Sequence, residues 1–516
     1  MYTRKTGDDY YDSEEFHQLL ERYEQAKAHG EPVFLDAEEL TDVADFYQMS
    51  GNDSQADEAI AMALSLAPDA VAPLTYKVHE EIFRGNTAGA RTYLARVADK
   101  SDPEYTYCRA EILLAENRPE EADKYLREQM ATVPVEEMQD YAYDVASICN
   151  EYGFNDLAMK WMARVKQDNS PDFKELLART LFGLGKYKDS EKIFNELLDH
   201  DPYSRQYWNA LASVQLMNED YSAAIQSSEF AIAIDPDDCD ALLAKANGLY
   251  RLTNYEEALK YYERYLAQIP DDEFALMYQG TCLVNLGRTD EAIEMLHRAI
   301  NIADEDSVCL CDIYVELAFA LSEKGETEEA MACIDEAEKM DHSHLQLPVI
   351  RGHLLLSADR MEEAEHYFSQ AIIESDDPPQ TLLRIIVSLY DNKYLESTYE
   401  MCHKYFDAVG DDATDGHAYM ALCCYDLKRY DEFLSSRADM TNLPDSYREQ
   451  MVDAYRMYID TERRTHRGIS SAVATRAEMD STLSLMQVFV MLTFADSTQE
   501  EVVVPMVRRD GQWKMR

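Results

Sequence analysis

The chain has 516 residues, with 100 Asp and Glu against 48 Lys and Arg, which gives a formal net charge of −52. Nucleic acid and anionic membranes are therefore poor partners, because both require a positive surface, whereas a basic or neutral protein is compatible. The simplest explanation of the charge is that it keeps a long surface soluble. Hydrophobic residues make up 46% of the sequence, so the chain can bury a large core.

The N-terminal residues predict a short helix from Ser13 to His29 and no signal peptide. MYTRKTGDDYYDSEEF lacks the apolar segment of a secretory signal. The most apolar run, Leu483 to Phe494, is too short to span a bilayer. We expect a cytoplasmic protein with reduced cysteines and no membrane span, in which residues 1–31 form an N-terminal helical cap.

A helical pattern with a period of 34 residues follows this cap. Its clearest copies align Ala224, Ala258 and Ala292, and Pro236 and Pro270 follow the first two at a constant distance. Small residues also recur twelve positions upstream of each alanine, at Ala212, Ala246 and Gly280. Two antiparallel helices that cross closely require a small residue on each helix, and proline ends the second helix. The spacing therefore predicts a repeated pair of helices.

This pattern resembles the tetratricopeptide repeat (TPR) family, whose 34-residue unit is a helix, a turn and a second helix. Three units match the family's signature in register, and they begin at Trp208, Leu242 and Leu276. With less fidelity, the register extends from Ala56 to Thr398. The resemblance implies an all-α fold, a TPR superhelical solenoid of about twelve units over residues 32–443.

The pattern changes in residues 444–516. One amphipathic helix is predicted up to Gly468, and the period then becomes two, with strands at 483–494, 501–508 and 512–516. Asp510-Gly511 is typical of a two-residue hairpin turn. We expect a C-terminal helix plus a three-stranded antiparallel β module. The closing DGQWKM resembles the last hairpin of small α+β folds of the nuclear transport factor 2-like type.

The charge also changes in this C-terminal module. From Arg463 to Arg516 the chain has eight Lys or Arg against six Asp or Glu, whereas the rest is strongly acidic. A near-neutral segment with ERRTHRG at its start can dock on an acidic surface of the same chain or of a second copy. Self-association through the C-terminal module is therefore possible.

The sequence has no motif that predicts catalysis or a cofactor. It lacks the phosphate-binding loop, the dinucleotide-binding glycine turn and the nucleophile elbow of hydrolases. His79-Glu80 begins like a zinc protease helix, but Phe83 stands where the second histidine is required. The cysteines between 309 and 333 and the histidines between 342 and 366 lack the spacing typical of a metal site. We expect no enzyme activity, no cofactor and no metal.

The family resemblance implies that the first helix of each repeat lines a concave groove, which binds a peptide segment or a partner helix. Candidate contacts are polar or aromatic residues on the face of the first helix that points away from the second helix. By register these are Arg179, Asn209, Asn247, Arg251, Tyr278 and Asn285. The alternative is that these side chains are merely solvated.

We therefore predict a non-catalytic protein–protein interaction scaffold whose partner is a protein or peptide of unknown identity. The first alternative is a regulatory sensor, in which the groove or the C-terminal module binds a small ligand or a short peptide. The second alternative is an enzyme whose catalytic residues are scattered along the groove.

Overall fold

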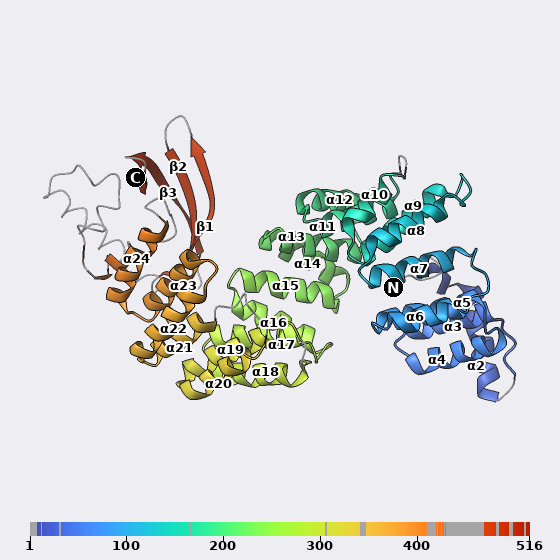
Figure 1. Cartoon of the computed structure of the whole chain (residues 1–516), viewed down its shortest axis with the longest axis horizontal. Coiled ribbons are helices and arrows are strands. Elements are labelled where there is room, and N and C mark those ends of the chain that lie inside the picture. Colours follow the sequence, from blue (N-terminus) through green and yellow to red (C-terminus); the bar gives the residue numbers. More distant parts are fainter. Residues whose placement is uncertain are drawn as a thin grey trace. The chain divides into compact units, whose positions relative to one another are not determined.

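The computed structural model describes residues 8–11, 13–29, 32–165, 168–304, 307–340, 347–409, most of 419–429, and four strands between 469 and 515. Contacts divide the chain into two compact units, Met1–Glu219 and Asp220–Arg516, which are called unit 1 and unit 2 below. In each unit the described helices are arranged as successive pairs (Figure 1). This division of the chain is not predicted from the sequence.

Unit 1 begins with α1 (Asp8–Tyr11) and α2 (Glu14–His29), where the sequence predicts one short helix. The first helices of its repeats are α3 (Ala37–Met49), α5 (Val71–Phe83), α7 (Pro103–Ala115), α9 (Met138–Glu151), α11 (Pro171–Gly183) and α13 (Arg205–Met217). The second helices are α4 (Asp53–Leu66), α6 (Thr87–Leu94), α8 (Pro119–Met130), α10 (Asn155–Met162) and α12 (Tyr187–His200).

Unit 2 begins with the second-type helix α14 (Tyr221–Ile234). Its first helices are α15 (Cys239–Arg251), α17 (Glu273–Asn285), α19 (Leu310–Lys324), α21 (Leu347–Ser357) and α23 (Pro378–Asp391). The second helices are α16 (Tyr255–Leu266), α18 (Thr289–Ile302), α20 (Thr327–Ala337), α22 (Met361–Glu374) and α24 (Leu395–Val409). Neighbouring first helices contact each other from α15 to α23, and in unit 1 from α3 to α11.

The small residues of the repeat lie where the two helices of a pair cross. The hydroxyl of Ser190 on α12 donates a hydrogen bond of 2.7 Å to the carbonyl oxygen of Ala178 on α11. A Cβ atom at Gly280 on α17 would lie 2.7 Å from Cγ of Leu296 on α18. The residues aligned with Ser190 are all buried, as the spacing predicts: Ala56, Ala90, Ala122, Ala158, Ala224, Ala258, Ala292, Ala330, Ala364 and Thr398.

Acidic residues of the repeat cap the first helices. The carboxylate of Asp238 accepts a hydrogen bond from the backbone N–H of Ala241, and Asp272 accepts one from Ala275. An aspartate at this position satisfies an N–H that the helix itself leaves without a partner. Part of the chain's acidity is therefore used in starting helices.

The turn between the two helices of each pair contains one residue with a positive φ angle. Glycine occupies this place in several turns, among them Gly287 with φ of 71°. In the turn from α15 to α16 the residue is Thr253, with φ of 59°. A β-branched residue is strained in this left-handed region, whereas glycine is not.

The C-terminal strands form one antiparallel sheet in the order β1-β2-β3-β4. The strands are β1 (Ile469–Asp480), β2 (Leu485–Phe494), β3 (Gln499–Arg509) and β4 (Gln512–Met515). The predicted module of three strands is wrong in its number of strands, because β1 pairs with β2 along almost its whole length. The helix predicted up to Gly468 lies outside the described residues.

The strained turn at Thr253 yields a first prediction. Thr253→Gly should raise the free energy of unfolding by about 0.5–1 kcal/mol, because relief of the backbone strain exceeds the entropy that glycine adds to the unfolded chain. The reciprocal change Gly287→Thr should lower it by about 1–2 kcal/mol. Urea unfolding followed by circular dichroism measures both changes. A lower unfolding midpoint for Thr253→Gly would contradict this interpretation.

Candidate binding surfaces of the first helices

One register position runs along the first helices and marks the surface that they share. In unit 1 it holds His79, Glu111 and Arg179, and in unit 2 it holds Asn247, Thr281, Phe319, His353 and Val387. Because neighbouring first helices contact each other within each unit, these side chains follow one another along one surface of that unit. Two of the predicted groove residues, Arg179 and Asn247, belong to this set.

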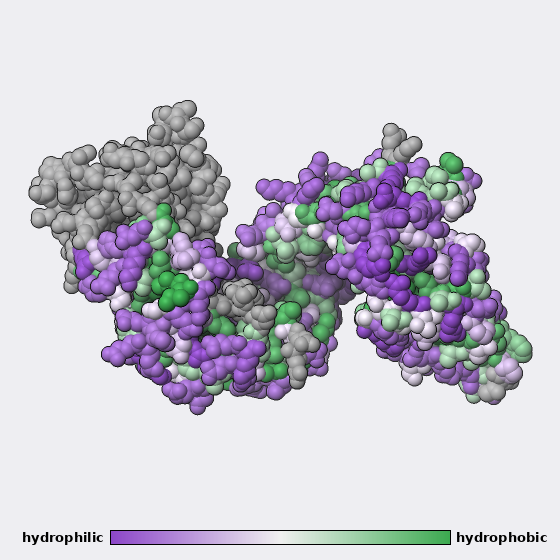
Figure 2. Space-filling view, in the orientation of Figure 1, coloured by the Kyte–Doolittle hydropathy of each residue, from purple (hydrophilic) through white to green (hydrophobic). Residues whose placement is uncertain are grey.

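In unit 2 this surface contains a hollow of about 220 Å³. Seven residues line it, and all come from three successive first helices: Phe319 from α19, Val349, Ile350 and His353 from α21, and Arg384, Val387 and Ser388 from α23. The lining is mainly apolar, whereas hydrophilic residues dominate the face of the molecule in Figure 2 and hydrophobic residues form separate patches on it. None of these seven residues is among the six predicted groove contacts.

The hollow combines a neutral imidazole with one cationic side chain. The rings of His353 and Phe319 meet edge to face, with centroids 5.6 Å apart. The side-chain amide of Asn392 lies 3.4 Å from Nδ1 of His353. Burial lowers the pKa of His353 below its ordinary value of 6.5, although Asp391 acts in the opposite direction. Arg384 is exposed and makes no ion pair with any residue that the structure describes.

Models of the family described as "Tetratricopeptide repeat" match three stretches of the chain, residues 176–238, 243–307 and 312–344. This part of the chain, between residues 176 and 344, contains tetratricopeptide repeats. The matched stretches cover α12, α13, α14, α16, α17, α18 and α20 in full, together with most of α11, α15 and α19. The match includes the three units that the sequence analysis aligned first.

Three solved structures are similar to parts of this chain. MamA from Desulfovibrio magneticus RS-1 is 16% identical and aligns over 34% of this chain and 98% of its own, with a TM-score of 0.32. YrrB, described as a TPR protein with an unusual peptide-binding site, is 19% identical over 39% of this chain and 97% of its own, with a TM-score of 0.32. TTC0263 from Thermus thermophilus is 21% identical over 36% of this chain and 100% of its own, with a TM-score of 0.30.

Among curated proteins, no sequence matches the chain. Within its described residues, no helix is both long enough and apolar enough to cross a membrane.

Two predicted groove residues, Asn247 and Tyr278, contact a cluster of tyrosines. The hydroxyl of the buried Tyr262 on α16 donates a hydrogen bond of 2.7 Å to Oδ1 of Asn247. The Tyr262 ring stacks on Tyr278 with centroids 6.1 Å apart, and Tyr250 contacts Tyr278 edge to face at 4.9 Å. Asn247 therefore satisfies a buried hydroxyl, and Tyr278 packs between neighbouring repeats.

The other predicted groove residues are placed differently. Arg179 is exposed on α11 but forms an ion pair of 2.7 Å with Glu175 on the same helix. Asn285 uses its side-chain amide to donate to the carbonyl oxygen of Thr281. Arg251 is exposed at the end of α15, and Asn209 is half-buried on α13. Arg179 and Asn209 belong to unit 1, and the other four residues belong to unit 2.

Apolar side chains on a helix usually lie in the core, so they do not stand out in the sequence as contacts. The repeat register nevertheless contains a signal that could have identified the lining of the hollow. Phe319, His353 and Val387 continue the position of Asn247 and Thr281 at steps of 38, 34 and 34 residues. Partly exposed apolar or aromatic side chains that recur at this position of successive first helices indicate a candidate binding surface.

The contact between Tyr262 and Asn247 yields a second prediction. Asn247→Ala leaves a buried hydroxyl without its acceptor and should lower the free energy of unfolding by about 1–3 kcal/mol. A double-mutant cycle with Tyr262→Phe should give a coupling of about 1 kcal/mol. Both values come from denaturant unfolding. If Asn247 were only solvated, its change to alanine would stay within about 0.5 kcal/mol and the coupling would vanish.

The buried imidazole yields a third prediction. NMR titration should give His353 a pKa below 6.5, because protonation places a charge in an apolar hollow. The unfolded chain then binds the proton first as the pH falls, so the free energy of unfolding decreases from pH 6.5 down to the lowered pKa. The resonance that disappears in His353→Gln assigns the signal. A pKa at or above 6.5 would rule out this environment.

Proposed function

We propose that this TPR protein is a non-catalytic scaffold that binds a segment of a protein partner on the first-helix surface of unit 2. The hollow between α19, α21 and α23 carries the proposal. It lies on the surface that successive first helices share, and its lining comes from three repeats rather than from the interior of one. Part of this apolar lining, Phe319, Ile350 and Val387, stays partly exposed and is therefore available to a partner.

The lining selects the chemistry of the partner segment. Phe319, Ile350 and Val387 provide apolar contact, and burial keeps His353 neutral. Arg384 supplies a guanidinium that no described residue neutralises through an ion pair. A segment with an apolar side chain next to a carboxylate satisfies both features, since a guanidinium pairs with a carboxylate through two parallel hydrogen bonds. Flanking residues of the segment should be neutral or basic, because the chain itself is strongly acidic.

The regulatory sensor is the second candidate, because a hollow of this kind can also hold a small ligand. Its size, however, argues against this alternative. A volume of about 220 Å³ lies below the usual size of a pocket that encloses a small ligand, about 300–1,000 Å³. Three successive repeats suit an extended or helical segment better. The nuclear transport factor 2-like character of the C-terminal hairpin and self-association through that module stay predictions.

The fourth prediction tests the binding surface with a matched pair of variants. Peptides selected from a display library on the full chain should combine an apolar residue with a neighbouring Asp or Glu. Val387→Asp should weaken their binding by about tenfold or more, because it places a charge in the apolar lining. Arg384→Ala should weaken it by a similar factor, since the carboxylate loses its partner. Fluorescence anisotropy measures the affinities.

The control is Ile373→Asp, which introduces the same charge at a strongly exposed isoleucine on the second helix α22. Ile373→Asp should leave peptide binding unchanged, and circular dichroism should show that all variants fold. Equal affinities for Val387→Asp and the unchanged chain would refute the proposal. Small molecules that raise the melting temperature while no peptide binds would favour the sensor.

A further inference from the structure

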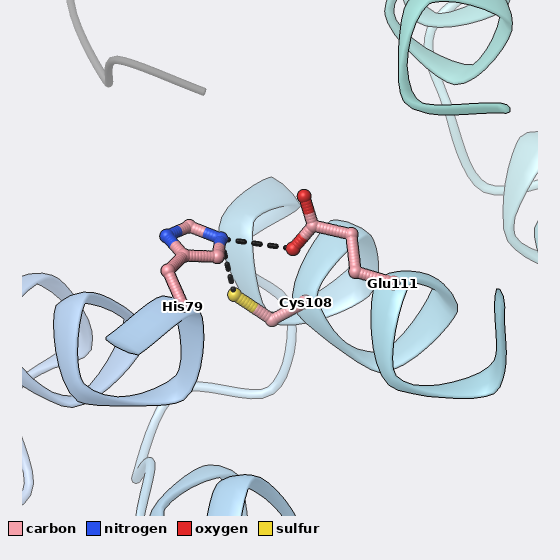
Figure 3. A group of neighbouring side chains, drawn as sticks. All are labelled: His79, Cys108 and Glu111. Carbon is pink, nitrogen blue, oxygen red and sulfur yellow. Dashed lines mark hydrogen bonds and ion pairs between the residues drawn. The ribbon is translucent and has the colours of Figure 1, made fainter. Parts of the chain in front are cut away.

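Three potential metal ligands converge on the first-helix surface of unit 1. His79 comes from α5, and Cys108 and Glu111 come from α7, the first helix of the next repeat (Figure 3). Nε2 of His79 lies 2.8 Å from Oε2 of Glu111 and 3.4 Å from Sγ of Cys108. The three ligand atoms all lie within 4.8 Å of one another. One nitrogen, one sulfur and one oxygen therefore surround a common point.

The cluster is buried on the side of α7 and open to solvent on the side of His79. Cys108 and Glu111 are buried, whereas the side chain of His79 keeps 23% of its exposure. An ion can therefore reach the cluster past the imidazole, and a water molecule can complete its coordination. Apart from the contact with His79, Glu111 has no ion pair among the residues that the structure describes.

One of the separations already fits a tetrahedral metal site, and a second approaches it. Zinc bonds to nitrogen, oxygen and sulfur of about 2.0–2.3 Å place pairs of ligand atoms roughly 3.3–3.6 Å apart. The separation of Nε2 and Sγ already falls in this range. The separation of Nε2 and Oε2 is shorter and must widen by about 0.5 Å, which a rotation of the exposed histidine or of the glutamate can supply.

The electrostatic environment also favours a cation. Burial on its own would lower the pKa of His79, but Cys108 and Glu111 outweigh it and raise that pKa well above its ordinary value. Burial and the neighbouring Glu111 raise the pKa of Glu151 on α9. A second carboxylate therefore acts on the cluster from the next repeat. A divalent ion would satisfy these groups together.

The same geometry argues against a nucleophilic cysteine. A catalytic relay needs one ring nitrogen for the nucleophile and the other for the carboxylate. Here Nε2 of His79 faces both Cys108 and Glu111. Burial raises the pKa of Cys108 to about 11, so the thiol keeps its proton in the absence of a metal ion.

We propose that His79 Nε2, Cys108 Sγ and the Glu111 carboxylate bind one divalent transition-metal ion of the zinc type, with a fourth position open to water. Binding displaces the proton of the thiol, and the ion takes the place of the proton on Nε2. Because the ligands come from α5 and α7, the ion joins two successive repeats. An open fourth position distinguishes this arrangement from a closed structural site.

The fifth prediction concerns cobalt, which reports thiolate ligation by its absorption. The full chain, freed of metal with a chelator, should bind one Co²⁺ per chain and show a thiolate-to-cobalt charge-transfer band. Cys108→Ser should abolish the band. His79→Asn and Glu111→Gln should each weaken binding at least tenfold in a chelator competition. Zinc should displace the cobalt.

The matched control is Cys149→Ser, which removes another buried thiol on a first helix of unit 1. It should leave the charge-transfer band intact. The control is needed because the chain has ten cysteines and 100 acidic residues that can hold metal ions loosely. Circular dichroism of the metal-free variants separates loss of the site from loss of the fold.

A measurement without variants keeps the proposal testable if a ligand variant fails to fold. X-ray absorption of the zinc-loaded full chain should fit one sulfur at about 2.3 Å together with nitrogen or oxygen neighbours. Absence of tight metal binding, a shell of only nitrogen and oxygen, or a charge-transfer band that survives Cys108→Ser would each overturn the proposal.

Discussion

Each repeat of the chain depends on one close crossing between its two helices. The hydrogen bond from Ser190 to the carbonyl oxygen of Ala178 and the short approach of Gly280 to Leu296 show how little space the crossing leaves. A larger residue at such a point would push the second helix outward. The first helices of neighbouring repeats would then lose the contacts that align them. The binding surface thus depends on small residues that it does not expose.

The crossing is also the reason why the helical fold can be predicted from the sequence. It requires a small residue at a constant interval, so Ala224, Ala258 and Ala292 mark the repeats without knowledge of any tertiary contact. Two features lacked such a local signal. The boundary between the units falls inside a regular repeat, at Glu219 and Asp220. The apolar and polar residues of strand β1 alternate irregularly, so its sequence does not predict a strand. Its pairing with β2 identifies it in the structure.

The repeat register predicts which helices carry the candidate surfaces, but not which residues form them. Register placed Asn247 and Tyr278 on first helices, yet their main partner, Tyr262, comes from a second helix. The hollow requires three helices, and the ligand cluster requires two, so neither forms a motif in one segment. Phe319 and Cys108 belong to residue types that usually lie in the core, and sequence spacing shows the helix face of a residue but not what that face contacts.

The two surfaces show how one repeat supports different chemistry. The register position that holds Glu111 in unit 1 holds Phe319 in unit 2, so the backbone presents a carboxylate in one place and an aromatic ring in the other. In a chain with a net charge of −52, a cationic side chain without an ion pair is a distinctive binding feature. Many arginines pair within one turn, as Arg360 does with Glu363, whereas Arg384 has no ion pair among the described residues. A carboxylate at Arg384 is attracted locally while the rest of the surface repels acidic segments, so charge favours a partner with one acidic group in a neutral or basic context.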